Sequence, residues 1–327
     1  MVPGRRLPRW LRGGRRRGPA RTRGVSMGEV LWRPDPGRAE TTRIEAFRRE
    51  AERRWGRALP DWAALHAWSI DAREEFWTSV WEFCEVRATR PWDRVLDQPD
   101  AMPGSVWFPG AELNFAENLL ARTGSRPAII ATSEATPRRE LSWDGLHREV
   151  ARCAAALAGL GVGRGDRVAG LLPNGPEAVI AMLATASLGA VWSSCSPDFG
   201  AQGVRDRFGQ IEPRVLIACD GYVYAGKRCD VLPTVAGLQR DLPSLAATII
   251  VPFMRPFPDL SGLARRTTWE TWLDQAPDRP LAFEPTPFDH PLYILYSSGT
   301  TGLPKCMVHS VGGTLLQHLK EHRLHTD

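Results

Sequence analysis

The spacing of apolar residues near the N-terminus is helical. Over residues 42–55 they recur every three or four positions, which predicts a helix. A second helix is predicted to begin at Asp71, because Asp71 and Glu74 have the spacing of a capping box. Trp77 and Trp81 follow at helical spacing, so they are expected to pack in a core and not to form a ligand platform.

Beyond residue 127, short apolar runs alternate with stretches of helical spacing. Residues 143–160 are predicted to form a helix capped by Ser142, and Pro176 is expected in the first turn of the next helix. The predicted strands are residues 128–132, 166–173, 190–194, 215–219, 248–252 and 292–297. Strands that alternate with helices are typical of parallel sheets. The sequence therefore predicts an α/β fold, with an N-terminal helical segment followed by a doubly wound, mostly parallel sheet.

The positive charge of the chain is concentrated at its N-terminus. The formal net charge of the 327 residues is +5, and residues 1–26 hold nine arginines and no acidic residue. Without those nine positive charges the remainder carries −4. Frequent Pro and Gly predict a disordered tail. Three interpretations are open: a mis-assigned start ahead of Met27 or a linker, a transit peptide, and a nucleic-acid-binding tail. We favour the first and expect no nucleic-acid partner.

The composition argues against several kinds of site. Six scattered cysteines form no C-x-x-C pair, so neither a metal site nor a disulfide framework is expected. Cys153, Cys195 and Cys219 lie in apolar runs and are expected in the core. The longest apolar stretch, residues 178–192, is too short to span a bilayer, and no membrane partner is expected. Ser196 lacks a surrounding G-x-S-x-G sequence and is not expected to be a nucleophile.

A polar loop follows the last predicted strand and has the chemistry of an anion site. Its residues are Ser297, Ser298, Gly299, Thr300, Thr301, Gly302, Leu303, Pro304 and Lys305. Hydroxyl groups, backbone N–H groups freed by glycine and one ammonium suit a polyphosphate. Lysine occurs only at positions 227, 305 and 320 among 42 Lys and Arg residues, so its use here is notable. Because ligands of open α/β sheets bind at the carboxyl ends of strands, we predict a phosphate-binding loop, although not of the Walker A type.

The loop carries a family resemblance. SSGTTGLPK resembles the phosphate-binding signature of the acyl-adenylate-forming (AMP-binding) superfamily, and the pattern fits from Ile294 to Lys305. The longer segment YSSGTTGLPKCMVHSVGGTLLQHLKEHRLH resembles acetoacetyl-CoA synthetases, including Cys306, where most relatives have glycine. LNFAENLL at residues 113–120 and SLGAVWSSCSPDF at residues 187–199 also resemble this group, and the latter is expected to be structural. The resemblance extends from about residue 31 to the last residue.

The resemblance implies an acetoacetate–CoA ligase that acts in the cytoplasm, in lipid and ketone-body metabolism, with an acetyl- or propionyl-CoA synthetase as the alternative. It implies ATP, Mg²⁺ and coenzyme A as cofactors and only small molecules as partners. Thr300, Thr301 and the loop amides would hold the β- and γ-phosphates, with Lys305 adding charge. Lys227 lies in a segment that resembles the one in which acetyl-CoA synthetases hold the coenzyme A 3′-phosphate, and it takes the place of a phosphate-binding cation there. A solvated surface lysine is an equal alternative. His309 is expected to be a hydrogen-bonded core histidine.

The resemblance also divides the chain. Residues 1–26 form the tail, residues 27–110 a helical segment of the acetyl- and acetoacetyl-CoA synthetase type, and residues 111–327 a truncated AMP-binding domain. The family's acidic Mg²⁺ residues, ribose-binding aspartate and catalytic lysine are expected beyond residue 327. We therefore expect a fragment without catalytic residues or metal ligands, with little or no ligase activity alone. An exposed sheet edge and poor solubility are expected too. A nucleic-acid-binding protein and an inactive interaction fragment remain the alternatives.

Overall fold

The computed structural model describes residues 31–33, 35–297 and 302–326. It divides into two compact units, Met1–Thr41 and Thr42–Asp327. In the first unit, helix α1 (Pro36–Glu40) is capped by Asp35, whose carboxylate accepts a hydrogen bond from the Gly37 amide at 2.8 Å. The arginine-rich residues 1–26 lie outside the described residues. The helices and strands after α1 belong to the second unit.

Three helices open this unit: α2 (Arg43–Trp55), α3 (Trp62–Asp71) and α4 (Arg73–Phe83). The first confirms the predicted helix at residues 42–55. The predicted capping box at Asp71 is wrong, because Asp71 is the last residue of α3, a helix that was not predicted. A capping residue needs an extended backbone. Asp61 has that conformation instead, and its carboxylate accepts a hydrogen bond from the Ala64 amide at 2.8 Å.

Aromatic rings hold these helices together. The Phe47 ring of α2 lies 5.9 Å from the Phe76 ring and 5.4 Å from the Phe83 ring, both in edge-to-face geometry. Trp81 is buried and its ring centre lies 4.9 Å from that of Phe108. Such ring pairs add stability beyond the area they bury. The tryptophan stripe of α4 is therefore packing surface, as the helical spacing predicted.

Short elements connect the helices to the main sheet. They are β1 (Leu96–Asp97), β2 (Val106–Trp107), β3 (Glu112–Leu113), α5 (Phe115–Leu119), β4 (Pro127–Ala131), β5 (Arg139–Ser142) and β13 (Thr286–Pro287). Buried Asn114 joins three segments: its amide nitrogen donates to the carbonyls of Ala186 and Glu284, both at 2.9 Å, and its side-chain oxygen caps α5. The predicted strand 128–132 corresponds to β4, which pairs with β5 in a separate two-stranded sheet.

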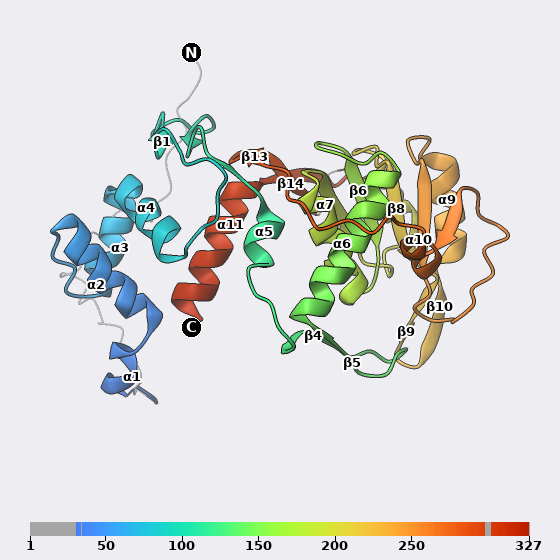
Figure 1. Ribbon diagram of the computed structural model, residues 1–327, viewed down its shortest axis with the longest axis horizontal. Coiled ribbons are helices and arrows are strands. Elements are labelled where there is room, and N and C mark those ends of the chain that lie inside the picture. Colours follow the sequence, from blue (N-terminus) through green and yellow to red (C-terminus); the bar gives the residue numbers. More distant parts are fainter. Residues whose placement is uncertain (1–30, 34, 298–301, 327) are drawn as a thin grey trace, which may run out of the picture. The chain divides into compact units, whose positions relative to one another are not determined.

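The centre of the unit is a seven-stranded sheet with the order β12-β11-β8-β6-β7-β14-β15. Figure 1 labels its strands β14, β6 and β8. Its strands are β6 (Arg167–Leu171), β7 (Val191–Cys195), β8 (Val215–Cys219), β11 (Ala247–Val251), β12 (Arg266–Thr268), β14 (Pro291–Ser297) and β15 (Lys305–Ser310). Every pair is parallel except β14 with β15, which form an antiparallel hairpin. The doubly wound, mostly parallel sheet is confirmed.

The helices cover both faces of this sheet. They are α6 (Trp143–Gly159), α7 (Pro176–Ser187), α8 (Ala201–Phe208), α9 (Leu232–Asp241), α10 (Trp269–Asp274) and α11 (Val311–Lys320), which ends in a π-helical turn, η2 (Glu321–His325). The crossover β6-α7-β7 runs one way along the sheet and β7-α8-β8 runs the other way. Because parallel crossovers are right-handed, α7 and α8 lie on opposite faces. Accordingly α6 packs on α7, and α9 packs on α8.

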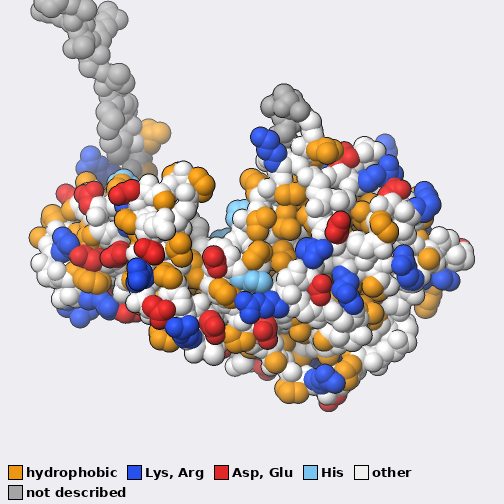
Figure 2. Space-filling model, turned by 90° about the horizontal axis from the view of Figure 1, so that it is seen from above, with side chains coloured by type: hydrophobic (Ala, Val, Ile, Leu, Met, Phe, Trp, Pro, Cys, Tyr) orange, Lys and Arg blue, Asp and Glu red, His pale blue; other side chains and the backbone are white. Residues whose placement is uncertain are grey.

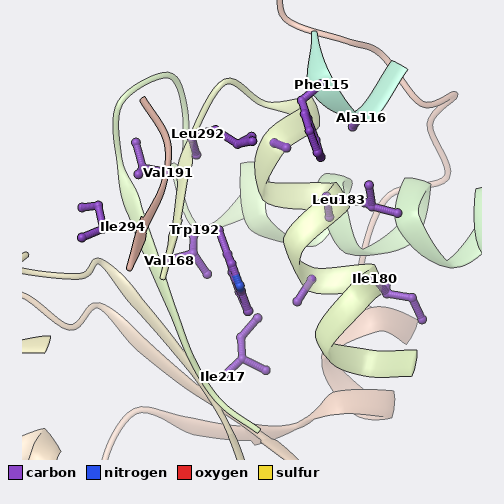
Figure 3. Close-up of a cluster of buried hydrophobic side chains, with 14 of the residues drawn as sticks. Phe115, Ala116, Val168, Ile180, Leu183, Val191, Trp192, Ile217, Leu292 and Ile294 are labelled. Atoms are coloured by element: carbon purple, nitrogen blue, oxygen red, sulfur yellow. The ribbon is translucent and has the colours of Figure 1, made fainter. Parts of the chain in front are cut away.

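The core between α7 and the sheet shows why glycine is needed in β6. The Trp192 ring lies among Val168, Ile180 and Ile217 (Figure 3). A Cβ atom at Gly170 would stand 2.6 Å from the Trp192 ring, so only glycine leaves room for it. Leu292 and Ile294 of β14 are also buried beside this cluster, so the core extends as far as β14.

Candidate nucleotide-binding site

The carboxyl edge of the sheet gathers the loops that could bind a ligand. Strands β8, β6, β7 and β14 are mutually parallel neighbours, so all four end at the same edge. The β14–β15 loop and the segment after β8 therefore open on one side of the molecule. Three strand spacings of about 4.8 Å separate the ends of β8 and β14, or roughly 14 Å. Open α/β sheets bind ligands at this edge.

A hydrogen-bonded serine fixes the end of β14. Ser193 on β7 is fully buried, and its Oγ is hydrogen-bonded to the Ile294 carbonyl at 2.8 Å and to the Tyr296 hydroxyl at 2.9 Å. Burial raises the pKa of Tyr296 well above its ordinary value, so the phenol stays neutral. The strand that leads into the loop is thereby held in place one residue before the loop begins.

Two of the predicted site residues face each other across the hairpin. Ser297, the last residue of β14, is the register partner of Lys305, the first residue of β15. Gly302 has φ of +146°, a conformation that favours glycine, and a Cβ atom there would meet nothing within 4 Å. Lys305 is exposed. The structure therefore brings a hydroxyl and an ammonium to the two ends of the loop.

Four predicted site residues, Ser298, Gly299, Thr300 and Thr301, lie outside the described residues. Their assignment to phosphate binding stays a prediction.

The β15 side of the loop is fastened to the segment that follows α8. The side-chain amide of Gln210 donates to the Pro304 carbonyl at 2.9 Å, and the Cys306 thiol donates to the Gln210 side-chain oxygen at 3.6 Å. Cys306, which the sequence marked only as unusual, thus takes part in positioning the loop.

A second cation near the loop was missed in the sequence. The guanidinium of Arg207 on α8 lies 4.6 Å from the centre of the Phe199 ring and 5.8 Å from that of Tyr296. Both distances are within the range of cation–π contacts. Arg207 lies at least 90 residues before the loop in sequence, and the pairing of β7 with β14 brings the two together. Helical spacing in α8 gave no sign of this role.

Lys227 lies in a separate hairpin at the same edge of the sheet. Strands β9 (Gly221–Tyr224) and β10 (Lys227–Asp230) follow β8 and pair with each other, with Lys227 opposite Tyr224. The turn between them is held by the Glu134 carboxylate, which accepts hydrogen bonds from the amides of Ala225 at 3.1 Å and Gly226 at 2.9 Å. Lys227 itself is exposed. The geometry leaves its side chain accessible to a ligand.

The remaining candidate residues pack against other side chains. Cys153, Cys195 and Cys219 are buried, as predicted, and burial raises the pKa of each thiol, to about 12 for Cys195 and Cys219. His309 is half-buried on the edge strand β15 and its ring lies 5.3 Å from that of Tyr293, so the prediction of a core histidine is wrong.

No three His, Cys, Asp or Glu side chains are grouped to hold a metal ion in the part of the chain that the structure describes. Within that part, no helix is both long and apolar enough to cross a membrane.

A Ser/Thr/Gly loop and a lysine follow β14, at the edge of the sheet where open α/β sheets bind ligands, and this arrangement suits a nucleotide-binding enzyme. Residues 116–326 match the family model "AMP-binding enzyme", and residues 62–119 match "Acetyl-coenzyme A synthetase N-terminus". The first match covers well over half of the chain. The chain therefore belongs to the AMP-binding enzyme family.

Named relatives show which enzymes of this family the chain is similar to. An acetoacetyl-coenzyme A synthetase of Rhizobium meliloti is 50% identical over 90% of this chain and 45% of its own length. A malonamoyl-CoA synthetase of Penicillium aethiopicum is 41% identical over 91% of this chain and 43% of its own length. The solved acetoacetyl-CoA synthetase of Streptomyces lividans has a TM-score of 0.86 at 48% identity, over 92% of this chain and 46% of that one. The chain thus spans a little under half the length of these relatives.

Proposed function

We propose that this chain supplies the triphosphate-binding part of an acetoacetate–CoA ligase. The observation that carries the proposal is the hairpin at the end of β14, where Ser297 and Lys305 face each other beside a glycine-containing loop. The complete reaction would convert acetoacetate, ATP and coenzyme A into acetoacetyl-CoA, AMP and diphosphate through an acyl-adenylate. The relatives named for this reaction support the choice. The cytoplasm and ketone-body metabolism are the setting that this reaction implies.

The residues present fit the nucleotide's phosphates. An ammonium at position 305 and hydroxyl groups around it would hold the β- and γ-phosphates and stabilise the charge that leaves with diphosphate. Arg207 adds a fixed cation beside Tyr296, at the base of the loop. Mg²⁺ is proposed as a cofactor of the complete reaction, and among the described residues no three His, Cys, Asp or Glu side chains are grouped to hold it. Lys227 is proposed to bind the 3′-phosphate of coenzyme A.

The choice of acid is the least constrained part of the proposal. A relative named for malonamoyl-CoA is 41% identical, so similarity at this level is shared by enzymes named for different acids. Acetate and propionate remain the competing substrates. A panel of short acids, assayed with a protein that spans the whole length of the relatives, distinguishes them.

The three lysines provide a matched test of phosphate binding. Lys305→Ala is expected to weaken ATP binding about tenfold or more, the effect of losing one charge-assisted hydrogen bond. Lys227→Ala is expected to leave ATP binding unchanged and to weaken coenzyme A binding. Lys320→Ala, which removes an ammonium paired with Glu321 on α11, serves as the control for both ligands. Calorimetric titration of each variant measures these affinities. Equal loss of ATP affinity in all three variants would overturn the proposal.

A further inference from the structure

A single side chain, that of Gln210, is hydrogen-bonded to the residues on both sides of Lys305. Its amide nitrogen donates to the Pro304 carbonyl at 2.9 Å, and its amide oxygen accepts from the Cys306 thiol at 3.6 Å. Proline has no N–H group, so the carbonyl is the only hydrogen-bonding group of the Pro304 backbone, and Gln210 occupies it. Lys305 is thus held from both directions along the chain by one residue distant in sequence.

The carboxamide of Gln210 uses each of its polar groups. Its second N–H donates to the Asp206 carbonyl, one helical turn earlier, at 2.6 Å. The nitrogen faces Pro304 and Asp206 because both offer carbonyl oxygens, which can only accept. The oxygen is left to accept from the Cys306 thiol. Neither a carboxylate nor an apolar side chain of the same length can replace this set of bonds.

The backbone that carries Gln210 is itself fixed. It lies shortly after the end of α8, between the buried residues Phe208 and Ile211. The guanidinium of Arg167, on β6, donates to the carbonyls of Ile211 at 2.7 Å and Glu212 at 3.0 Å. A positioning contact is accurate only when its own anchor is held by packing and hydrogen bonds. Gln210 meets this condition and links the start of β15 to the interior of the sheet.

The lysine needs such support because of where it lies. Lys305 is the first residue of β15, where the hairpin with β14 meets the loop, and its side chain is exposed. A flexible side chain loses conformational freedom when it holds a ligand, and this loss weakens binding. On the surface seen in Figure 2, Lys and Arg side chains are dispersed among acidic and uncharged ones. A polyphosphate therefore depends on the placement of single cations more than on a continuous basic patch.

We propose that Gln210 is a positioning residue for Lys305 in polyphosphate binding. It holds the backbone on both sides of the lysine, so that the ammonium meets the phosphates at a lower cost in conformational entropy. Gln210 itself needs no contact with the nucleotide. The identity of the ligand rests on the proposed function, while the bonds to Pro304 and Cys306 do not depend on it.

The test compares glutamine variants in the binding of inorganic tripolyphosphate, measured by calorimetric titration. Gln210→Met keeps the length of the side chain and removes its hydrogen bonds, and it is expected to weaken binding about fivefold, the effect of about one hydrogen bond. Gln202→Met is the matched control and is expected to leave binding unchanged. It is the same substitution on the same helix, at a glutamine bonded to Asp206 and Arg205. Equal losses in the two variants would overturn the proposal.

A double-mutant cycle shows whether Gln210 acts through Lys305. If it does, Gln210→Met made in the Lys305→Ala protein is expected to weaken binding no further, because the group that it positions is gone. A loss of about fivefold in both backgrounds would mean that Gln210 only supports the fold, and the proposal would be wrong. Cys306→Ala removes only the bond to a weak donor and is expected to weaken binding about twofold or less.

A measurement without ligand separates this proposal from the proposed function. The amide relaxation of Lys305, measured by NMR, is expected to show greater motion in Gln210→Met than in the parent, and no change in Gln202→Met. If the parent binds neither tripolyphosphate nor ATP, the proposed function fails and the role of Gln210 in phosphate binding falls with it. If the parent binds tripolyphosphate but Lys305 is equally rigid in all three proteins, only the positioning by Gln210 is refuted.

Discussion

The two edges of the main sheet are built differently. At one edge, β12 has only three residues, Arg266, Thr267 and Thr268, which are polar and of which Arg266 is exposed. Its neighbour β11 is buried at all five positions. Helix α10 follows β12, with the buried rings of Trp269 and Trp272 in contact at 5.8 Å. A short polar strand beside a covered neighbour is the usual way to end a sheet.

The other edge lacks these protections. β15 is twice as long as β12, and its central residues Met307 and Val308 are apolar and exposed. The loop proposed to bind ATP joins this strand to β14. The two edges therefore differ in strand length, polarity and exposure. Stability measurements at matched positions can test that difference.

The largest effect is expected at Asp220, on the β12 side. This carboxylate is fully buried after β8 and accepts hydrogen bonds from the amides of Phe253, Met254 and Arg255 at 2.7 to 2.9 Å. Asp220→Ala leaves those amides without their acceptor and is expected to lower the free energy of unfolding by about 3–5 kcal/mol. Urea unfolding followed by tryptophan fluorescence gives the value.

The control for this variant is Asp230→Ala. Asp230 pairs with the Arg255 guanidinium at 3.1 Å, and its side chain is 47% exposed, so a loss of at most about 1 kcal/mol is expected. If the two variants were equally destabilised, the buried carboxylate would not be what anchors this side of the sheet.

A smaller loss of stability is expected from the substitution of valine by alanine, made once near each edge of the main sheet. Val251 on β11 is 5% exposed, and Val251→Ala is expected to cost about 2 kcal/mol, for two methyl groups and the cavity they leave. Val308→Ala on β15 is expected to change the stability of this chain by no more than about 0.5 kcal/mol. Similar losses at the two positions, measured by the same urea unfolding, would show that β15 is as well covered as β11.

The helices and strands of this fold could be predicted well because each is determined by residues close together in the sequence. Strands β8 and β11, predicted at residues 215–219 and 248–252, are buried at every position of the observed strands, so their apolar composition alone marks them. Ser142 was predicted to cap α6, and its Oγ accepts a hydrogen bond from the Gly145 amide at 3.0 Å. The position of the loop after β14 followed from the same pattern.

What the sequence could not predict depends on contacts between distant segments. Asp71 was expected to start a helix and instead ends one, since the packing of α3 overrides the local capping signal. Arg207 reaches the base of the loop only because β7 and β14 are neighbours. The strand at residues 128–132 was expected in the parallel sheet, yet its partner is β5. Strand partners are set by the whole fold and leave no mark in a single strand's composition.

The smallest predicted effect depends on pH and concerns α10, beside the β12 edge. Partial burial, together with the negative charges of Glu149 and Asp274, raises the pKa of the Glu270 carboxyl above its ordinary value of 4.5. The folded chain therefore binds this proton more tightly than the unfolded chain does, and the resulting stability is lost as the pH rises through the raised pKa. Arg152 opposes the shift, and Glu270 remains in contact with water, so the effect is small.

Glu270→Gln removes the charge that is costly at high pH. The variant is expected to unfold at a slightly higher temperature than the parent at pH 8, by a degree or two for about 0.5 kcal/mol. The two melting temperatures should converge as the pH falls below 4.5, because the parent carboxyl then becomes protonated in both states. Calorimetric melting between pH 4 and pH 8 measures this convergence. A constant offset at every pH would mean that the glutamine changes packing, and that charge does not limit the β12 edge.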